Sequence, residues 1–348
     1  MESMGLADFY KGKKVFLTGH TGFKGTWLVN ILKFFGSQIT GYALEPPTKP
    51  SLFEIAETSE KIRSIYGDIR DFSSLLTAMQ TSEPEIVIHL AAQPIVRESY
   101  KNPKETFETN VMGTVNVLEA LRKTPSVKSF VNVTTDKVYK NKEWLWGYRE
   151  TEELCGLDPY SNSKSCSELV TYSYKKSFFE NASDLRISTA RSGNVIGGGD
   201  FAPDRIIPDC IRYAREKGEI IVRNPFSIRP YQHVLECLYG YLLLAKKQFE
   251  NKDFEGAYNF GPESKDCIST GQLVDIFCKS WGGNLKWKKF NEENAPHEAS
   301  FLKLDNSKAK SLLGWFPKWS IETAVKKVVE WERGCSIEKQ IEEFFLGV

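Results

Sequence analysis

The stretch Lys13–Phe35, KKVFLTGHTGFKGTWLVNILKFF, decides the fold of this chain. Its first part, Lys13 to Leu17, is a short apolar run typical of a buried strand, and Trp27 to Phe35 repeats apolar residues at helical spacing. Between them lies a turn, Thr18 to Gly25, that is rich in glycine. A strand, a glycine turn and a helix in this order predict the first unit of a parallel sheet.

The same alternation continues along the chain. Strands are predicted at Gln38–Leu44, Ile86–Ala91, Ser129–Val133 and near Arg186–Ala190, and helices at Phe72–Thr81, at Val111–Lys123 and after Pro159. Strands that alternate with helices favour a parallel sheet covered by helices on both faces. We therefore expect an α/β chain with a Rossmann-type, doubly wound parallel sheet.

Charge and targeting signals exclude several function classes. The 46 basic residues nearly balance the 45 acidic ones, so no broad basic field indicates nucleic acid or an anionic membrane. The amino terminus has no apolar signal region, and no apolar run approaches the roughly 18 residues of a membrane span. We expect a cytoplasmic protein that binds neither nucleic acid nor membrane.

Seven cysteines are scattered along the chain without a CxxC pair. An odd, scattered set argues against a disulfide framework or a zinc site. The four histidines are too far apart in sequence to form a local metal motif. We predict reduced cysteines and no bound metal.

The glycines of the first turn are spaced GxxGxxG. Glycine permits a tight turn and lets backbone N–H groups approach a pyrophosphate, which the N-terminus of the next helix also attracts. A glycine turn without a ligand is the alternative that the motif alone leaves open. We interpret the turn as a dinucleotide site. Its predicted cofactor residues are Gly19, Thr21, Gly22, Phe23, Lys24 and Gly25.

Further residues extend this site and select the dinucleotide. Glu45 ends the second predicted strand, near the place where an acid bonds the adenosine ribose of NAD. An acid there repels a 2′-phosphate and no Arg lies in residues 41–49, so NAD is preferred over NADP. Asp68 and Ile69 are expected to flank the adenine, with a helix cap as the alternative for Asp68. The crevice end of the next strand adds Leu90, Ala91 and Ala92.

Tyr160 and Lys164 stand four residues apart at the start of a predicted helix, so both side chains share one face. The ammonium is expected to lower the pKa of the tyrosine from near 10, so that Tyr160 can deprotonate a sugar hydroxyl beside the cofactor. A solvated helix face is the competing interpretation. Thr135, Asp136 and Lys137 favour chemistry, because they place a hydroxyl, an acid and an amine at the carboxyl edge of the sheet.

Six segments are long enough to identify a family. They are TGHTGFKGTWL (Thr18–Leu28), GYALEPPTKPSLFE (Gly41–Glu54), HLAAQPIVRESY (His89–Tyr100), NVTTDKVYKNKEWLWGYRE (Asn132–Glu150), GNVIGGGDFAPDRIIPD (Gly193–Asp209) and RNPFSIRPYQHVLE (Arg223–Glu236). They resemble the nucleotide-sugar dehydratase branch of the extended short-chain dehydrogenases/reductases, and the resemblance runs almost from end to end of the chain.

The resemblance implies a reaction. A hexose is oxidised at C4, water is eliminated between C5 and C6, and the hydride held by NAD returns to C6, with CDP-glucose as the implied substrate. Thr135, Asp136, Tyr160 and Lys164 take catalytic positions, with Asp136 as the acid for O6. Related dTDP-glucose and GDP-mannose dehydratases have glutamate where this chain has Lys137, and a lysine can act as the C5 base only if its pKa falls from about 10.4.

The resemblance also implies substrate contacts and an assembly. The implied substrate residues are Gln93, Thr135, Arg191, Asn194, Asn224, Arg229 and His233. Arg229 is expected to bind the diphosphate, because a guanidinium offers a planar fork to two phosphate oxygens, although a structural ion pair is the alternative. The helices after Asn110 and Tyr160 resemble those that pair in family dimers, so a homodimer or homotetramer is expected.

The length of 348 residues leaves room for a second domain. We predict an NAD-binding domain over residues 1–190, to which segments near 231–262 return, and a smaller, mixed α/β domain for the nucleotide sugar in 191–348. Two other functions stay open. A sugar-nucleotide 4-epimerase shares the glycine turn and Tyr160/Lys164 but is distinguished by Asp136 and Lys137. An NAD-sensing protein without turnover is possible on the same fold.

Overall fold

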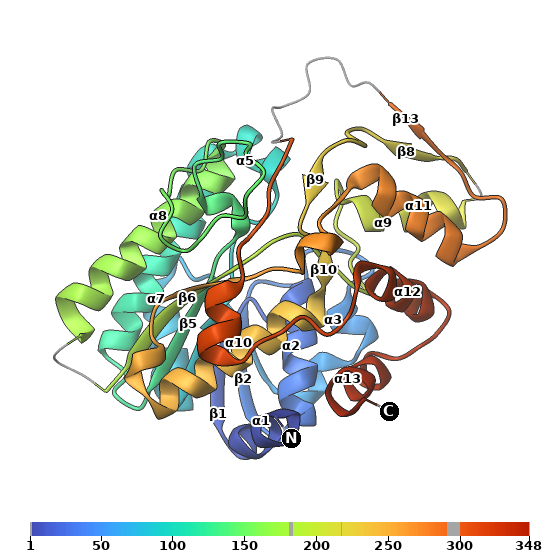
Figure 1. Cartoon of the computed structure of the whole chain (residues 1–348). Helices are drawn as coiled ribbons and strands as arrows, with labels where there is room; N and C mark the ends of the chain where they lie inside the picture. The colour runs from blue at the N-terminus through green and yellow to red at the C-terminus, as the bar shows by residue number, and fades with distance from the viewer. Residues whose placement is uncertain (1, 181–183, 217, 291–299, 348) are drawn as a thin grey trace.

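A computed structural model describes residues 2–180, 184–216, 218–290 and 300–347 (Figure 1). Its centre is a parallel sheet of seven strands in the order β11-β6-β5-β4-β1-β2-β3. The strands are β1 (Lys14–Thr18), β2 (Gln38–Ala43), β3 (Arg63–Tyr66), β4 (Ile86–His89), β5 (Ser129–Val133), β6 (Arg186–Ser192) and β11 (Ala257–Phe260). The strand order reverses at β1, which confirms the doubly wound prediction and creates a crevice at the carboxyl ends of β1 and β4.

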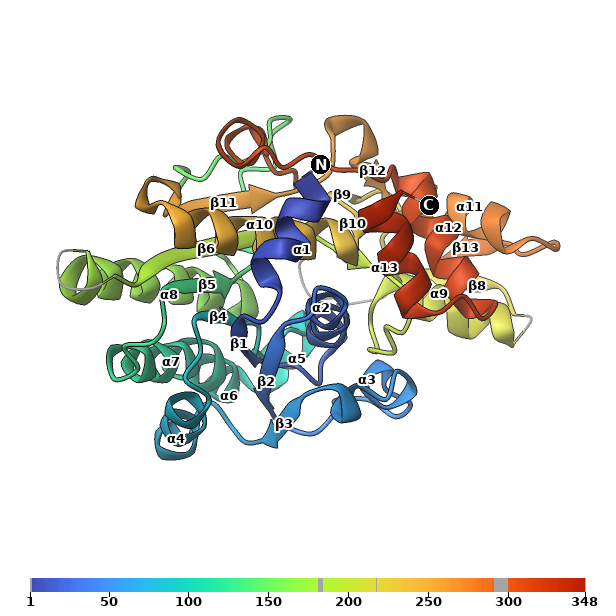
Figure 2. The same cartoon turned by 90° about the horizontal axis from the view of Figure 1, so that it is seen from below.

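Two helix layers cover the sheet, and Figure 2 shows them on opposite faces. One layer contains α1 (Glu2–Tyr10), α2 (Phe23–Phe34), α10 (Val234–Glu250) and α13 (Ile337–Leu346), and the other α4 (Phe72–Ser82), α7 (Gly113–Arg122) and α8 (Pro159–Tyr174). The side chains of β1 point alternately toward these two layers. Val15 and Leu17 belong to the core under α2 and α10, whereas Phe16 belongs to the core under α4 and α7. Side chains of successive strand residues point to opposite faces, so both faces need apolar residues.

A third core lies beside the sheet, mostly in the later part of the chain. It is built from α9 (Ile206–Arg215), α11 (Thr270–Trp281), α12 (Ile321–Glu332), β8 (Ile220–Val222) and β13 (Trp287–Lys289). Two small strand pairs join it to the sheet: β7 (Val195–Ile196) with β10 (Gln232–His233), and β9 (Ile228–Arg229) with β12 (Ile268–Ser269). Further α-helices are α3 (Leu52–Ile55), α5 (Val96–Lys101) and α6 (Pro103–Phe107).

Single helical turns complete the secondary structure. They are the 3₁₀ segments η1 (Thr58–Lys61), η3 (Asp136–Val138), η5 (Lys252–Phe254) and η6 (Ser264–Asp266), and the π segments η2 (Glu108–Met112), η4 (Lys175–Phe179) and η7 (Ala309–Leu313). None of the helices in the described part of the chain combines the length and apolar character that a bilayer crossing requires.

Most of the predicted elements are present, and two differ. The strand predicted at Ile86–Ala91 ends at His89, and the next residues form a loop at the crevice. Strand β3 was not predicted, because it lies at the sheet edge and its residues are exposed or half-buried, so it has no apolar run.

Candidate active site

A cavity of about 1390 Å³ opens in the crevice at the carboxyl ends of the strands. Typical pockets for one ligand measure roughly 300–1,000 Å³, so this cavity has room for a dinucleotide and a second ligand. The predicted site residues that line it are Gly19, Thr21, Gly22, Phe23, Lys24, Gly25, Glu45, Asp68, Ile69, Leu90, Ala91, Ala92, Gln93, Thr135, Lys137, Tyr160, Lys164, Asn194, Asn224 and Arg229. Predicted residues from Gly19 to Arg229 therefore meet in one cavity.

Three predicted residues lie behind this lining. Asp136 is fully buried next to the lining residues Thr135 and Lys137. Arg191 is 3% exposed and forms an ion pair with Glu168. His233 is fully buried, caps α10 by accepting a hydrogen bond from the Leu235 amide, and lies against two tryptophan rings. The structure thus places Arg191 and His233 in the packing between elements and not at the cavity where the substrate was expected.

The glycine turn between β1 and α2 forms a close-fitting cradle. Gly19 has φ +76°, and a Cβ there would lie 2.7 Å from the Ala91 amide nitrogen. A Cβ on Gly25 would lie 2.1 Å from the Gly19 carbonyl oxygen. Gly22 is the N-cap of α2 and brings no capping side chain, so the first amides of the helix are available to an anion. These features fit a pyrophosphate.

The acidic end of the cavity fits an adenosine with free ribose hydroxyls. Glu45 and Asp68 both line it, and Asp68 is bound by Arg70 through two hydrogen bonds of 2.6 and 2.9 Å from its guanidinium. Partial burial raises the pKa of Asp68, but the hydrogen bonds from Arg70 lower it overall. Asp71, rather than Asp68, caps α4. Arg70 also lines the cavity, yet Asp68 and Glu105 offset its charge.

The end of β5 brings together an acid, an amine and a hydroxyl. Asp136 Oδ1 accepts hydrogen bonds from Thr135 Oγ1 at 3.0 Å and from Lys137 Nζ at 3.1 Å. Lys137 Nζ also donates to Asn194 Oδ1 at 3.2 Å, and its side chain is 28% exposed. The second carboxylate oxygen of Asp136, Oδ2, is buried and has no hydrogen-bond partner among the described residues. This oxygen therefore keeps unused hydrogen-bonding capacity directly behind the cavity lining.

Tyr160 and Lys164 share the same face of α8, but burial has changed both groups. Burial raises the pKa of Tyr160 to about 12, against a smaller lowering by the Thr135 hydroxyl. Burial and then the charge of Lys24 lower the pKa of Lys164 to about 8, while Glu168 raises it. The sequence-based expectation that Lys164 lowers the pKa of Tyr160 below 10 is wrong in this structure, because desolvation of the buried phenol is the largest effect on that pKa and raises it.

The far end of the cavity carries cations and amides. Arg229 is 7% exposed on β9, and its Nη1 donates to the Ile228 carbonyl at 3.0 Å. Gln93 lines the cavity, but its side-chain amide is held by Thr106 and by the Ile95 amide. Sequence reasoning missed Arg205, a lining residue paired with Asp200 at 3.1 Å, whose charge also reaches Tyr160. Its signal was a cation inside a segment already singled out, Gly193–Asp209.

The site holds a phenol, a carboxylic acid, two amines and a hydroxyl, a set suited to general acid–base chemistry. In the described part of the chain, no three His, Cys, Asp or Glu side chains are grouped so that they could hold a metal ion.

The profile of the GDP-mannose 4,6 dehydratase family matches residues 16–328. The chain belongs to this family. Over 331 residues, which are 94% of the chain and 92% of the relative, it is 48% identical to the CDP-glucose 4,6-dehydratase of Salmonella typhimurium. Both matches confirm the nucleotide-sugar dehydratase branch of the extended short-chain dehydrogenases/reductases.

Two solved structures have the same fold as this family member at lower identity. The UDP-glucose 4-epimerase of Thermotoga maritima, solved with UDP-glucose, is 23% identical with a TM-score of 0.79, over 92% of this chain and 98% of that one. The dTDP-glucose 4,6-dehydratase of Bacillus anthracis, solved with NAD, is 20% identical with a TM-score of 0.76, over 95% of this chain and 100% of that one. Dehydratases and epimerases thus share this architecture, so the residues of the site must distinguish them.

Proposed function

We propose that the chain is a CDP-glucose 4,6-dehydratase, which converts CDP-glucose to CDP-4-dehydro-6-deoxyglucose and water with bound NAD. One observation carries the proposal: Asp136, which has a buried oxygen without a hydrogen-bond partner among the described residues, is paired with Lys137, and Lys137 lines the same cavity as Tyr160. Elimination needs an acid and a base in addition to the groups for oxidation. The 48% identity to a CDP-glucose 4,6-dehydratase supports the substrate.

The glycine turn would hold the pyrophosphate of NAD through Gly22, Phe23 and Lys24 at the start of α2, and Glu45 would bind the adenosine ribose. NAD, when bound, supplies an acceptor for the C4 hydride, a donor for its return to C6, and a positive ring that favours the Tyr160 phenolate. Asp68, Glu45 and the pairing of Arg70 with two carboxylates support NAD over NADP.

Tyr160 is the proposed base for the C4 hydroxyl. Its hydroxyl lies near Thr135, which is placed to orient the sugar oxygen by a hydrogen bond. Lys164 Nζ donates to the Val133 carbonyl at 3.1 Å, so its ammonium is fixed at the end of β5. A fixed ammonium beside the cavity favours an oxygen that carries negative charge.

Asp136 and Lys137 are the proposed pair for the elimination. Once C4 is a ketone, the hydrogen on C5 is acidic and the hydroxyl on C6 is beta to the carbonyl. Lys137 is the proposed base for the C5 proton and Asp136 the proposed acid for O6, so that water leaves. The Asn194 amide oxygen orients the Lys137 amine.

The diphosphate and nucleoside are assigned to the far end of the cavity. Arg229 and Asn224 lie there on the segment that forms β9 and the loop before it, and Arg205 faces the same space from α9's N-terminal side. A buried guanidinium binds two phosphate oxygens more strongly than an exposed one, because water competes less.

We also infer the division of the chain and its assembly. The NAD-binding domain takes residues 1–190 and the returning segment near 231–262, which contains α10 and β11, and the rest of 191–348 mainly binds the nucleotide sugar. Exposed Leu169 and Tyr172 on α8 and exposed Met112 before α7 support a homodimer or homotetramer through these helices. All seven cysteines are free, which agrees with the proposed cytoplasmic location.

The test is a donor comparison. The purified protein is incubated with NAD and, separately, with CDP-glucose, dTDP-glucose, UDP-glucose and GDP-mannose, and mass spectrometry follows the loss of one water. Loss from CDP-glucose alone is expected. Loss from another donor keeps the mechanism and overturns the substrate, whereas a C4 epimer of unchanged mass, or no change at all, contradicts dehydration.

A further inference from the structure

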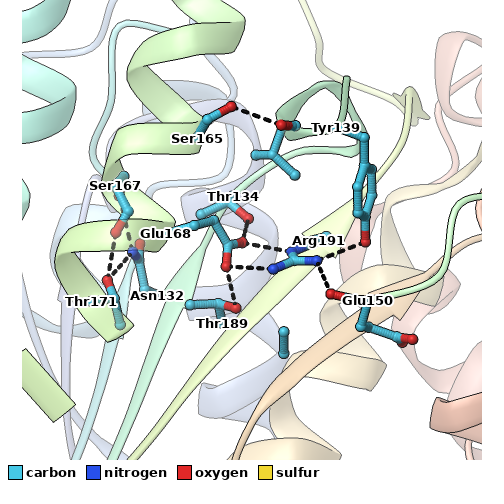
Figure 3. Close-up of polar contacts among 12 residues, drawn as sticks. Asn132, Thr134, Tyr139, Glu150, Ser165, Ser167, Glu168, Thr171, Thr189 and Arg191 are labelled. Carbon is cyan, nitrogen blue, oxygen red and sulfur yellow. Dashed lines mark hydrogen bonds and ion pairs between the residues drawn. The ribbon is translucent and has the colours of Figure 1, made fainter. Parts of the chain in front are cut away.

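Glu168 continues the series of Tyr160 and Lys164 along α8, because the three residues stand four apart on one helix face. Its carboxylate points from α8 toward the carboxyl halves of β5 and β6, where it faces the guanidinium of Arg191 (Figure 3). Glu168 and Arg191 are each only 3% exposed. Sequence analysis assigned Glu168 no role, although it lies one helical turn beyond a proposed catalytic lysine.

All four acceptor positions of the Glu168 carboxylate are filled. Oε1 accepts hydrogen bonds from the Thr134 hydroxyl and from Arg191 Nε, the latter at 2.9 Å. Oε2 accepts from Thr189 Oγ1 at 2.7 Å and from Arg191 Nη2 at 2.9 Å. We call these residues, Glu168 with Thr134, Thr189 and Arg191, the Glu168 network.

Arg191 extends the network to a third part of the chain. Its Nη1 donates to the Tyr139 hydroxyl at 2.8 Å and to the Glu150 carbonyl at 3.1 Å (Figure 3). Protein groups thus bind the Arg191 guanidinium on both sides through four hydrogen bonds. This explains why it does not reach the cavity.

The Glu168 network joins the three stretches that carry the proposed chemistry. Thr134 immediately precedes the Thr135–Lys137 stretch at the end of β5. Arg191 is near the end of β6, three residues before Asn194, which contacts Lys137. Glu168 itself is on the helix that carries Tyr160 and Lys164. One carboxylate thus sets the relative position of base, acid and ammonium.

Docking of α8 does not by itself require a charge at Glu168. Neutral hydrogen bonds already join α8 to β5 and the segment after it on both sides of the network: Asn132 donates to Ser167 and Thr171, and Ser165 donates to the Val138 carbonyl (Figure 3). A buried ion pair loses much of its Coulomb energy to desolvation and is often replaceable by neutral groups without loss of stability. The charge of Glu168 can still act on Lys164, which lies one turn earlier on the same face of α8 and is also buried.

We propose that Glu168 is a positioning residue for the proposed dehydration: its carboxylate holds the Thr134–Lys137 stretch in place, and its negative charge keeps the buried Lys164 in the ammonium form. This inference rests on the proposed function for its effect on turnover. Glu168 itself does not line the cavity, so it acts through the residues that do.

The groups around Lys164 support this assignment. Burial and the cation Lys24 on α2 both lower the pKa of Lys164, and Glu168 raises it. Before NAD binds, Tyr160 on the same helix is uncharged, because burial raises its pKa to about 12. His89 on β4 also faces Lys164 but is neutral, because burial lowers its pKa to about 3. Glu168 is thus the negative charge that offsets the loss of the Lys164 proton.

The experiment compares wild type with Glu168→Gln, Glu168→Asp and the neutral pair Glu168→Gln/Arg191→Gln. The neutral pair keeps amide hydrogen bonds across the network and removes both charges. The control is Glu255→Gln, which removes a partly buried carboxylate that pairs with Lys175 beyond the far end of α8. For each protein, kcat and KM for CDP-glucose are measured from pH 6 to 9.5, together with Tm.

We expect the neutral pair to keep a Tm near that of wild type. Its alkaline limb, which is the fall of kcat/KM at high pH, should begin about one pH unit lower, so kcat/KM at pH values within the limb is about tenfold smaller than in wild type. Glu168→Asp keeps the charge, so its limb stays in place while kcat falls because the shorter side chain cannot reach Thr134. Glu255→Gln leaves both limb and kcat unchanged. Should Glu168→Gln fail to fold, the neutral pair and Glu168→Asp still separate charge from position.

An unshifted limb in the neutral pair would show that the charge of Glu168 has no role beyond packing, and would overturn the proposal. A wild-type protein that dehydrates no sugar nucleotide overturns the proposed function instead. In that case, competitive labelling of Lys164 with acetic anhydride, read by mass spectrometry across pH, still decides the question. The same downward shift of the Lys164 titration in the neutral pair supports the inference, and an unchanged titration refutes it.

Discussion

The end of β5 and the Glu168 network each contain a fully buried carboxylate, but the two are hydrogen-bonded differently. Asp136 has one oxygen with two donors and a second, buried oxygen without a partner in the described structure. Glu168 has donors at all four positions. Most buried polar groups are satisfied, and leaving one unsatisfied costs about 1–3 kcal/mol. We therefore assign a chemical role to Asp136, whose hydrogen bonds are incomplete, and a positioning role to Glu168, whose hydrogen bonds are complete.

The largest expected effect comes from a change to Asp136, the carboxylate with an unpartnered oxygen. Asp136→Asn removes the proposed acid for O6, so dehydration should fall by roughly 10²–10⁴-fold. Oxidation at C4 does not need this acid, so reduced nicotinamide should accumulate in a single turnover. Absorbance of the cofactor and product mass are the measurements. Full dehydration by this variant would remove Asp136 from the mechanism.

A change within the Glu168 network is expected to lower the stability of the protein. Arg191→Met leaves the buried Glu168 carboxylate without its cation, and breaking a buried pair in this way costs about 3–5 kcal/mol. Urea denaturation measures the free energy of unfolding. Lys104→Met is the control, because its pair with Glu108 is mostly exposed and should change the stability little. Equal stability of Arg191→Met and this control would contradict the role given to the network.

The two regions meet at Lys164, whose pKa is lowered to about 8. A lysine with a lowered pKa loses its proton as pH rises through that value, so kcat/KM should fall above about pH 8, by about tenfold per pH unit. Lys164→Arg keeps its charge at all these pH values and should lose the alkaline limb, at a lower rate throughout. A wild-type limb that persists in Lys164→Arg would assign it to another group.

The smallest expected effects come from removing a single hydroxyl donor from Glu168 or from Asp136. Thr189→Val removes one of four donors to Glu168 and should lower the free energy of unfolding by about 1.5 kcal/mol, as for hydrogen bonds to charged groups. Thr135→Val removes a donor to Asp136 and a proposed contact to the sugar, so activity should fall more than stability. Urea denaturation and kcat/KM of both variants test this, and the reverse pattern would contradict the comparison.

Local chemistry made much of the site predictable. The spacing of Gly19, Gly22 and Gly25 requires a close turn, because side chains at two of these positions would collide with backbone. Strand ends in a parallel sheet meet at one edge, so residues after β5 and at the start of α8 were expected together, and both line the cavity. The roles of these residues stay proposals.

Other features depend on packing between distant segments. Arg191 faces the interior because it pairs with Glu168, 23 residues earlier in the chain. No local sequence pattern predicts that pair. The spacing of Tyr160 and Lys164 gave their common face but not their burial, so the direction of the Tyr160 pKa was missed. The edge strand β3 was not predicted because its residues are exposed or half-buried, so its sequence has no apolar run.

The return of β11 to the sheet has a consequence for synthesis on the ribosome. β11 pairs with β6, yet 64 residues separate the end of β6 from its start. At ~5–20 residues per second, the nascent chain carries β6 as an unpaired edge for roughly 3 to 13 seconds. An open edge strand is a template for association with another chain, so this interval is where newly made protein most needs a chaperone.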